Sequence, residues 1–274
     1  MQNNRHILAQ KLMEKRFMSA LKAVIFDVDG TLAETERDGH RVAFNRAFID
    51  NGLDWHWDPI LYGELLAVTG GRERIRYYLE NFHLQCGFNG DPSAILDKVH
   101  GDKTRHYGQL LNEKNIHLRI GVKRLINECR EAGLRLAIAT TSMPENVRGL
   151  IKNTLGDEAI HWFDCIADGS SVGPKKPASD VYHYCLDKMS LSPEDCLVIE
   201  DSANGLQAAL GANLQTLITT NNYTESEDFT GALSVINQLG DPNEPTTVIA
   251  GQAISDNYIS VNTLRELHGK AFAY

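Results

Sequence analysis

The chain has 274 residues, a hydrophobic fraction of 42% and a net charge of −9 at pH 7. This length allows one large domain or two smaller ones, and the composition is ordinary for a globular protein. The acidic balance argues against nucleic acids and membrane surfaces as partners, because both are bound through a basic face, and no apolar stretch is long enough to span a bilayer.

The first 20 residues carry basic side chains among apolar ones, at Arg5, Lys11, Lys15 and Arg16. These charges interrupt every candidate for the apolar region of a secretory signal. We therefore interpret residues 1–20 as an N-terminal extension, with a transit peptide as the alternative. The five cysteines are odd in number and widely spaced, which favours a reducing compartment. We expect a cytoplasmic protein, or a plastid protein if the source is a photosynthetic eukaryote.

A mostly apolar run at residues 21–26 ends in Asp27-Val28-Asp29-Gly30-Thr31. The run predicts a buried strand, and because strand side chains alternate, Asp27 and Asp29 lie on one side of the chain. Two crowded carboxylates repel each other unless a cation or a shared proton compensates, and magnesium prefers such oxygen ligands. Gly30 permits a sharp turn whose amides face an anion. The segment predicts a magnesium-assisted phosphoryl site with a carboxylate nucleophile.

Between residues 35 and 111 the sequence has little strand signal, and four segments have helical patterns. They are 41–49, 61–66, 73–82 and 92–111. This stretch is too long for a loop between two strands of a sheet. It therefore predicts a helical module inserted after the first strand, of the kind that excludes water and reads the substrate.

Elsewhere, short apolar runs alternate with helical patterns. The expected strands are 23–26, 135–139, 165–167, 197–199 and 217–218, and the expected helices are 122–131, 144–155, 178–189 and 205–210. This alternation predicts an α/β fold with a mostly parallel sheet. We divide the chain into an N-terminal extension (1–20), a core domain (21–36 and 113–243), a helical cap domain (37–112) and a C-terminal extension (244–274) with a short helix at 261–270.

Three further polar segments follow or lie close to expected strands. They are Thr140-Thr141-Ser142, Lys176 before Pro177, and Glu200-Asp201. Taken alone, each has an ordinary interpretation as a strand end, an exposed loop or a helix cap. Because the carboxyl ends of parallel strands meet at one edge of the sheet, we expect all three beside Asp27. The hydroxyls and lysine would bind phosphate, and the acids would add metal ligands.

In this order the four segments resemble the motifs of the haloacid dehalogenase (HAD) superfamily, over residues 21–241. The resemblance implies a Rossmann-like parallel sheet with helices on both faces and a helical cap. Within the cap, the sequence is similar to the CbbY-type phosphatases, which resemble β-phosphoglucomutase in fold and are associated with xylulose-1,5-bisphosphate, a misfire product of Rubisco. The segments that carry this second resemblance are 34–40, 44–45, 55–58, 62–66 and 69–74.

The resemblance also implies roles for the core residues. Asp27 would attack phosphorus to form an aspartyl-phosphate, and Asp29 would act as general acid and then as general base. The implied magnesium ligands are Asp27, Asp29, Glu200 and Asp201. Thr140 and Lys176 would hold the transferring group, with help from the amides of Thr141 or Ser142.

For the cap, the resemblance implies that Glu36 contacts the sugar hydroxyls and that His40 and His100 bind substrate. His40 could equally be a capping or packing histidine. If the substrate is a bisphosphate, its second phosphate would be held by the segment Gly70-Gly71-Arg72-Glu73-Arg74, where glycines permit close approach and arginine binds phosphate through two nitrogens. The alternative is an ordinary charged helix start. Lys103 and Arg105 are expected to be ordinary charges on a helix face, with a place in the lining of the substrate pocket as the alternative.

Three functions compete. The first is a magnesium-dependent sugar-(bis)phosphate phosphatase, which the cap sequence favours and which needs only a monomer. The second is a phosphomutase of the same fold, or a phosphatase of another small phosphorylated metabolite, which the core motifs do not separate from the first. The third is a non-catalytic phosphate-binding module, which ranks last because every motif position holds a competent residue.

Overall fold

The computed structural model describes residues 21–68, 70–82, 92–113 and 116–271, and the predicted N-terminal extension lies outside them. The chain forms two compact units. The core unit contains residues up to Ala33 and from Leu118 onward, and the helical unit is Glu34–His117. The predicted boundaries after residues 36 and 112 both fall inside the helical unit. A helix already begins at Thr35, and Ile116 packs beside Gly39, so the flanking residues join the helical unit.

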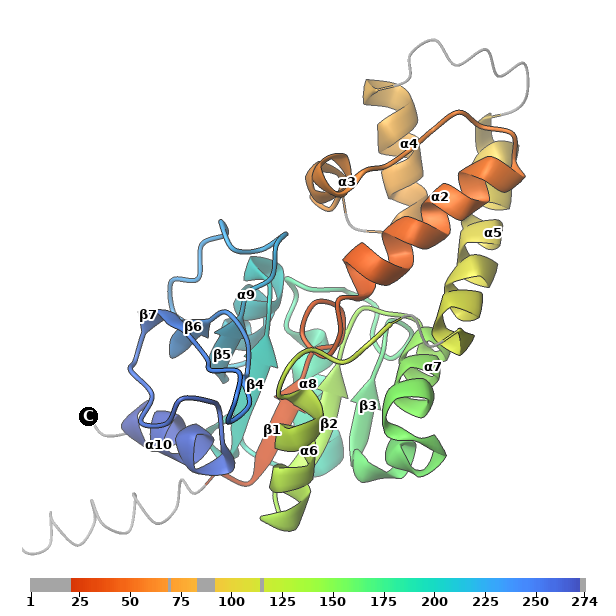
Figure 1. The fold of residues 1–274 in the computed structure, drawn as a ribbon. Helices are drawn as coiled ribbons and strands as arrows, with labels where there is room; N and C mark the ends of the chain where they lie inside the picture. Colours follow the sequence, from red (N-terminus) through yellow and green to blue (C-terminus); the bar gives the residue numbers. More distant parts are fainter. Residues whose placement is uncertain (1–20, 69, 83–91, 114–115, 272–274) are drawn as a thin grey trace, which may run out of the picture. The chain divides into compact units, whose positions relative to one another are not determined.

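A seven-stranded sheet forms the core unit (Figure 1). Its strands are β1 (Ala23–Phe26), β2 (Arg135–Ala139), β3 (Cys165–Ala167), β4 (Cys196–Glu200), β5 (Gln215–Thr219), β6 (Ser234–Ile236) and β7 (Val248–Gly251). Their order is β3-β2-β1-β4-β5-β6-β7, and all neighbouring pairs are parallel except β6 with β7. β1 therefore lies between β2 and β4, which brings the carboxyl ends of these three strands together.

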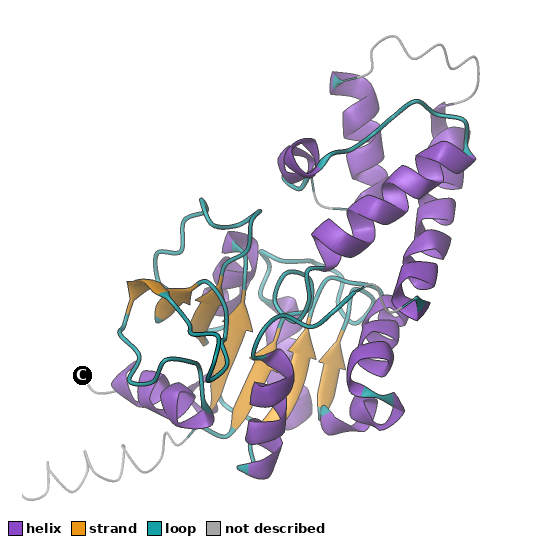
Figure 2. Ribbon diagram, viewed as in Figure 1, coloured by secondary structure: helices purple, strands orange, loops and turns teal. Residues whose placement is uncertain are grey.

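Helices cover both faces of this sheet, so the strands read as continuous apolar runs (Figure 2). On one face, α8 (Asp180–Met189) and α9 (Ala203–Gly211) pack against alternate strand residues such as Ile25, Ala137 and Val198. α6 (Val122–Glu131) lies on the opposite face, beside β2. α7 (Pro144–Leu155) and the short 3-10 helices η2 (Asp157–Trp162) and η3 (Pro193–Asp195) complete the connections between strands.

The helical unit consists of the π-helix η1 (Thr35–His40), α2 (Arg41–Asp50), α3 (Pro59–Leu65), α4 (Gly71–Asn81) and α5 (Pro92–Asn112). Its core is aromatic. The ring of Trp57 is fully buried and lies 4.7 Å from Phe44 and 4.8 Å from Phe48, measured between ring centroids. Large rings bury much apolar area with few rotatable bonds, which allows a unit of this size to hold a fixed shape. The predicted α/β fold with a helical insertion after the first strand is confirmed.

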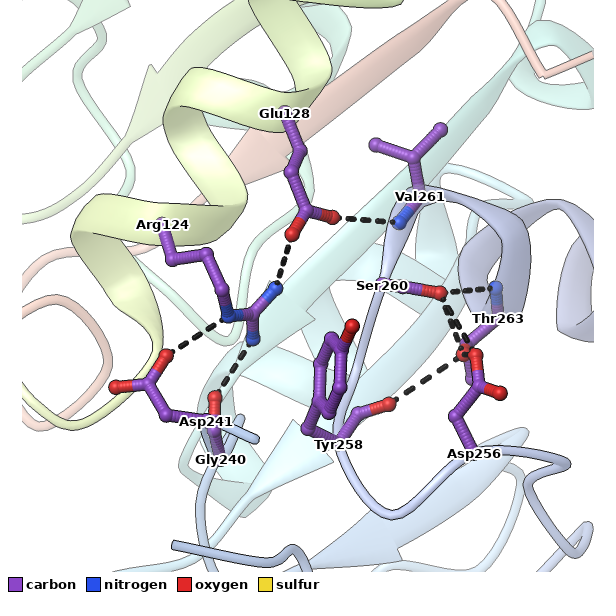
Figure 3. Close-up of polar contacts among 9 residues, drawn as sticks. All are labelled: Arg124, Glu128, Gly240, Asp241, Asp256, Tyr258, Ser260, Val261 and Thr263. Carbon is purple, nitrogen blue, oxygen red and sulfur yellow. Dashed lines mark hydrogen bonds and ion pairs between the residues drawn. The ribbon is translucent and has the colours of Figure 1, made fainter. Parts of the chain in front are cut away.

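The C-terminal segment belongs to the core unit and is not merely an extension. β7 adds an antiparallel strand to β6, and α10 (Val261–Ala271) packs beside α6. Figure 3 shows the polar contacts that hold this segment: Arg124 donates to Asp241 and to the Gly240 carbonyl, and Glu128 accepts from the amide of Val261. β6 and β7 escape prediction because no helix lies between β5 and β7, so the alternation of strands and helices that indicates the other strands is absent here.

No helix among the described residues is both long enough and apolar enough to cross a lipid bilayer.

Candidate active site

A tight turn follows β1 and carries the two aspartates. The amide of Gly30 donates to the carbonyl of Ala33 at 2.8 Å, and the amide of Leu32 donates to that of Val28 at 2.9 Å. Gly30 has a φ of +86°, which disfavours a side chain, and a Cβ there would lie 2.1 Å from Oδ2 of Asp201. The turn therefore requires glycine both for its backbone conformation and for the space that Asp201 occupies.

Three buried carboxylates gather at this turn. Asp27, Glu200 and Asp201 each offer an oxygen, and these oxygens lie within 4.8 Å of one another. Burial, followed by the charge of Glu200, raises the pKa of Asp27 to about 7. Burial and the charges of Asp27 and Glu200 also raise the pKa of Asp201 well above its ordinary value. A divalent cation with a preference for oxygen ligands fits this cluster, because its charge would offset the repulsion.

The ammonium group of Lys176 lies among these carboxylates and uses all three of its hydrogens. Nζ donates to Oδ1 of Asp27 at 2.7 Å, to the carbonyl of Ala139 at 2.9 Å and to Oε1 of Glu200 at 2.5 Å. Burial alone would lower the pKa of Lys176, but the charges of Asp27 and Glu200 outweigh it and raise the pKa. The surroundings of Lys176 therefore favour its charged form.

Glu200 accepts hydrogen bonds on both of its oxygens. Oε1 accepts from Lys176 and from the hydroxyl of Tyr182 at 2.8 Å, and Oε2 accepts from the amide of Asp201 at 3.0 Å and from the Ser202 hydroxyl at 3.4 Å. A carboxylate has about four acceptor positions. Glu200 would thus bind a metal ion directly only by giving up one of these donors. Tyr182 was not anticipated as a site residue.

The segment after β2 is ordered by its own hydroxyl. The amide of Thr140 continues the strand pairing by donating to Ala167 at 2.9 Å, and its Oγ1 accepts from the amide of Ser142 at 3.1 Å. Thr140 is buried, whereas Thr141 and Ser142 are half-buried. Because Ala139 already bonds to Lys176, the structure brings Thr140 to the same end of the sheet as Asp27.

Two residues of the core unit that the sequence analysis did not identify support the cluster. Asn221 donates to Oδ2 of Asp201 at 2.7 Å, and the positive charge of Arg119 opposes the effect of burial on the pKa of Asp201. Asn221 follows the end of β5 by two residues, so the rule that selected the ends of β1, β2 and β4 would also have selected it. Arg119 precedes a helix and carries no comparable signal.

In the helical unit, Glu36 belongs to a polar cluster with Tyr62 and Arg74. The hydroxyl of Tyr62 donates to Oε2 of Glu36 at 2.5 Å, and Nη1 of Arg74 donates to Tyr62 at 2.8 Å. Arg74 is buried and also donates to the backbone carbonyls of Leu65 and Val68. The Arg74 guanidinium therefore bonds to groups of the protein itself, whereas the sequence analysis gave it a role in binding a second phosphate.

His40 and Lys103 form a second cluster of the helical unit. The Nδ1 atom of His40 lies 2.9 Å from Nζ of Lys103, and the His40 ring stacks on Tyr107 at a centroid distance of 4.0 Å. Both His40 and Lys103 are buried, so Lys103 is not the ordinary helix-face charge of the first expectation. His100, Lys103 and Tyr107 are spaced three and four residues apart, so they lie on one helix face. This spacing is the feature of the sequence that could have placed Lys103 beside the expected substrate-binding residues. Arg105 is exposed, as expected, and pairs with Asp50.

The predicted phosphate segment begins α4. Gly70 has a φ of +98°, and a Cβ on Gly71 would lie 3.2 Å from the ring of His100, so this segment and His100 are neighbours. Burial lowers the pKa of His100. Arg72 is partly exposed and pairs with Asp97 at 2.8 Å.

The Glu73 side chain fills the space beside Gly70. Of the two arginines in the predicted segment, Arg72 therefore has the more accessible guanidinium.

Residues 21–213 match the family model described as haloacid dehalogenase-like hydrolase. The chain belongs to this family. It is an enzyme, a phosphatase of the HAD type. Asp27, Glu200, Asp201 and Lys176 lie together at one end of its sheet, and Thr140 follows β2 at the same end.

Among curated proteins, the chain is 46% identical over 225 residues to the plasmid-encoded protein CbbY of Cupriavidus necator, covering 82% of this chain and 88% of that protein. Among solved structures, CbbY from Rhodobacter sphaeroides in complex with phosphate is 44% identical, with a TM-score of 0.71, and the match covers 80% of this chain and 94% of that one. A variant of the same protein, solved with xylulose-1,5-bisphosphate, is 43% identical with a TM-score of 0.71, and the match has the same coverage. The cytoplasmic location and monomeric state stay predictions, and the plastid alternative is not borne out.

Proposed function

We propose that this HAD phosphatase is magnesium-dependent and hydrolyses a sugar bisphosphate, xylulose-1,5-bisphosphate or a similar compound, through an aspartyl-phosphate. The observation that carries the proposal is the position of Asp27. It stands at the carboxyl end of β1, 2.7 Å from the ammonium group of Lys176, and its carboxylate oxygen lies within 4.8 Å of oxygens of two further carboxylates. The complex of the related CbbY with xylulose-1,5-bisphosphate supports the substrate class.

In the first step a carboxylate oxygen of Asp27 forms a bond to phosphorus, and the bond from phosphorus to the sugar oxygen breaks. Asp29 donates a proton to the departing sugar oxygen. In the second step Asp29 takes a proton from water, the water oxygen attacks phosphorus, and inorganic phosphate leaves while Asp27 is regenerated. Lys176, which donates to Oδ1 of Asp27, would supply positive charge beside the reacting group.

Asp27 and Asp201, with the carbonyl of Asp29, would hold Mg²⁺, and Glu200 would stay close by, since its oxygens already accept from Lys176, Tyr182 and the Asp201 amide. When bound, the ion supplies neutralisation of the phosphoryl oxygens in a loose transition state. Thr140 would donate its hydroxyl hydrogen to the transferring group, with Lys176 exchanging one of its protein acceptors for a phosphoryl oxygen.

For the helical unit we propose substrate recognition. Glu36 and His40 would contact the sugar hydroxyls, with Lys103 as the partner of His40. Arg72 and the start of α4, next to His100, would bind the second phosphate, because free amides at a helix start favour an anion. Arg74 would hold the backbone that precedes this segment, because it donates to the carbonyls of Leu65 and Val68.

The experiment that tests the function is a phosphate-release assay with Mg²⁺ across sugar monophosphates and bisphosphates. We expect a ketose bisphosphate to give the highest kcat/KM and exhaustive chelation to abolish turnover. Asp27→Asn should be inactive yet folded, and Asp29→Asn should lose about 10²–10⁴ in rate, the usual contribution of general acid–base catalysis. Full activity in either variant or under chelation contradicts the mechanism.

The same reactions also distinguish the phosphomutase alternative. A mutase would return the phosphate to the sugar, so isomeric sugar phosphates would accumulate in place of inorganic phosphate. Analysing both products from one reaction separates the two outcomes.

A further inference from the structure

The guanidinium group of Arg119 binds four backbone carbonyl oxygens from three separate segments of the core unit. It donates to the carbonyls of Gly30, Thr219, Thr220 and Asn237. The last three distances are 2.9, 2.5 and 2.9 Å. The acceptors lie in the turn after β1, at the end of β5 and just after β6. One side chain thus ties the turn that carries the aspartates to two neighbouring strand ends.

The backbone of Arg119 reinforces the same connection. Its amide donates to the carbonyl of Leu32 at 2.8 Å, and its neighbour Leu118 forms an antiparallel bridge with Ala33. Arg119 is the second residue after the chain re-enters the core unit, and Ala33 is the last residue before the chain leaves it. The two chain segments that lead from the core unit to the helical unit and back are therefore fixed to the core unit beside the turn that begins at Asp27.

Only an arginine has the donor geometry for this position. A guanidinium presents five N–H groups in a rigid plane, so it reaches carbonyls that point toward one another from different strands. A lysine ammonium at the same place has three donors on one nitrogen, and it would reach fewer of the four acceptors. The convergence of carbonyl dipoles also requires a positive charge, which Arg119 keeps at every accessible pH.

The bonds of Arg119 lead directly to the carboxylate cluster. Asn221, which donates to Oδ2 of Asp201 at 2.7 Å, also lies 3.5 Å from the carbonyl oxygen of Gly30. Asp201 fills the space in which a Cβ on Gly30 would lie. A shift of the Gly30 peptide would therefore move the surface on which Asp201 rests, and it would change the distance between Asp27 and Asp201.

We propose that Arg119 is a positioning residue of this enzyme, which sets the Gly30 turn and thereby the relative positions of Asp27 and Asp201. Its side chain would act through the turn, and the proposal includes no contact between Arg119 and the substrate. The inference rests on the proposed function for its catalytic readout. It also has a readout that needs no turnover, because a misplaced pair of carboxylates binds a divalent ion less tightly.

Arg124 provides a matched control in the same unit (Figure 3). Its guanidinium is also used fully by the protein: it donates to Asp241, Glu128 and the Gly240 carbonyl, and it lies 4.4 Å from the centroid of the Tyr258 ring. All these partners join α6 to the C-terminal segment, and none belongs to the carboxylate cluster. Loss of Arg124 should therefore cost stability without changing the geometry of Asp27.

The test compares Arg119→Ala, Arg119→Lys and Arg124→Ala. Thermal unfolding, kcat and KM are measured for each, and Mn²⁺ binding is followed by the electron paramagnetic resonance signal of the free ion. We expect both alanine variants to unfold at lower temperature. Only the Arg119 variants should lose kcat and Mn²⁺ affinity, each by about 10–100-fold as for other residues that orient metal ligands, with KM little changed. Added guanidinium ion should restore part of the kcat of Arg119→Ala.

The proposal is overturned if Arg119→Ala behaves like Arg124→Ala, losing stability while keeping kcat and Mn²⁺ affinity. A rise in KM at constant kcat also overturns it, since that pattern belongs to a substrate contact. If Arg119→Ala does not fold, Arg119→Lys carries the same comparison because it keeps the charge. If the wild-type enzyme releases no phosphate from any sugar phosphate, the proposed function fails, and the Mn²⁺ titration alone decides the role of Arg119.

Discussion

The ammonium group of Lys176 lies 2.7 Å from the carboxylate of Asp27, and both groups are buried. The same nitrogen also donates to Glu200. One lysine thus offsets two of the three carboxylates that meet at the end of β1, and Asp201, the third, depends on Asn221 and on the more distant charge of Arg119. This division explains how three acids remain close together in the folded chain, and it makes Lys176 the most sensitive single position of the cluster.

Replacing Lys176 by methionine should remove most of the activity. The loss of one fixed donor aimed at developing charge typically costs about 10²–10³ in kcat. The variant should also be less stable, because it leaves buried carboxylates without a partner, and Mg²⁺ should restore more stability to it than to the wild type. Phosphate release and thermal unfolding with and without Mg²⁺ measure both effects. Lys175→Met, at an exposed neighbouring position, should behave as wild type; equal loss in both variants would contradict the assignment.

The position of Glu200 depends on a glycine in α9. A Cβ on Gly205 would lie 2.0 Å from the Glu200 carboxyl carbon and from its Oε1. Gly205→Ala should therefore displace Glu200, weaken its hold on Lys176 and lower kcat, although alanine is the better helix former.

The control is the same substitution in α5, where a Cβ on Gly108 meets nothing within 4 Å. Gly108→Ala should raise stability by about 0.5–1 kcal/mol and leave kcat unchanged. If Gly205→Ala is as active as Gly108→Ala, Glu200 has no part in arranging the site.

Substitution of Arg72 should change the preference for bisphosphates, whereas substitution of Arg74 should change stability. Arg72→Ala should lower kcat/KM for a sugar bisphosphate about 10–100-fold more than for the matching monophosphate, the value of one or two charged hydrogen bonds. Arg76→Ala, an exposed position on the same helix, should leave this ratio unchanged. Arg74→Ala should instead lower the unfolding temperature, because Arg74 bonds to the backbone at Leu65 and Val68. An equal effect of Arg72→Ala on both substrates would remove it from the second-phosphate role.

The positions of the buried strands along the chain are readable from the sequence because parallel strands covered on both faces appear as short apolar runs. Three predicted strands, Ala23–Phe26, Arg135–Ala139 and Cys165–Ala167, have the predicted bounds. The rule that the carboxyl ends of such strands meet predicts that Asp27, Glu200 and Asp201 lie together. The order of the motifs predicts that Lys176 joins them. β6 and the edge strand β7 follow β5 without an intervening helix, so the alternation that indicates the other strands does not reach them.

The supporting residues depend on contacts that no local pattern records. Arg119 reaches carbonyls 89 and 118 positions away in the sequence, and Asn221 lies 191 positions from Gly30. Tyr182 looks like an ordinary apolar position of a helix, and its hydroxyl becomes informative only when Glu200 is seen beside it. The sequence thus predicts the groups that do chemistry better than the groups that hold them in place.

His268 should make stability fall in acid. It is buried in α10, and burial lowers its pKa below the ordinary value of 6.5, against the smaller effects of the Glu194 backbone and the Asp195 charge. The unfolded chain therefore takes up a proton near pH 6.5, whereas the folded chain resists protonation until a lower pH. Below about pH 6.5 the free energy of unfolding decreases until the folded histidine is also protonated, and above this range His268 has no such effect.

Urea unfolding of the wild type and of His268→Gln between pH 5 and pH 8 measures this contribution. The two stability curves should converge as the pH falls, because only the wild type loses the contribution of its buried neutral imidazole. His161→Gln, at an exposed position, removes a histidine without disturbing α10 and should keep the wild-type slope. Parallel curves for the wild type and His268→Gln would show that protonation of His268 does not control the docking of the C-terminal helix.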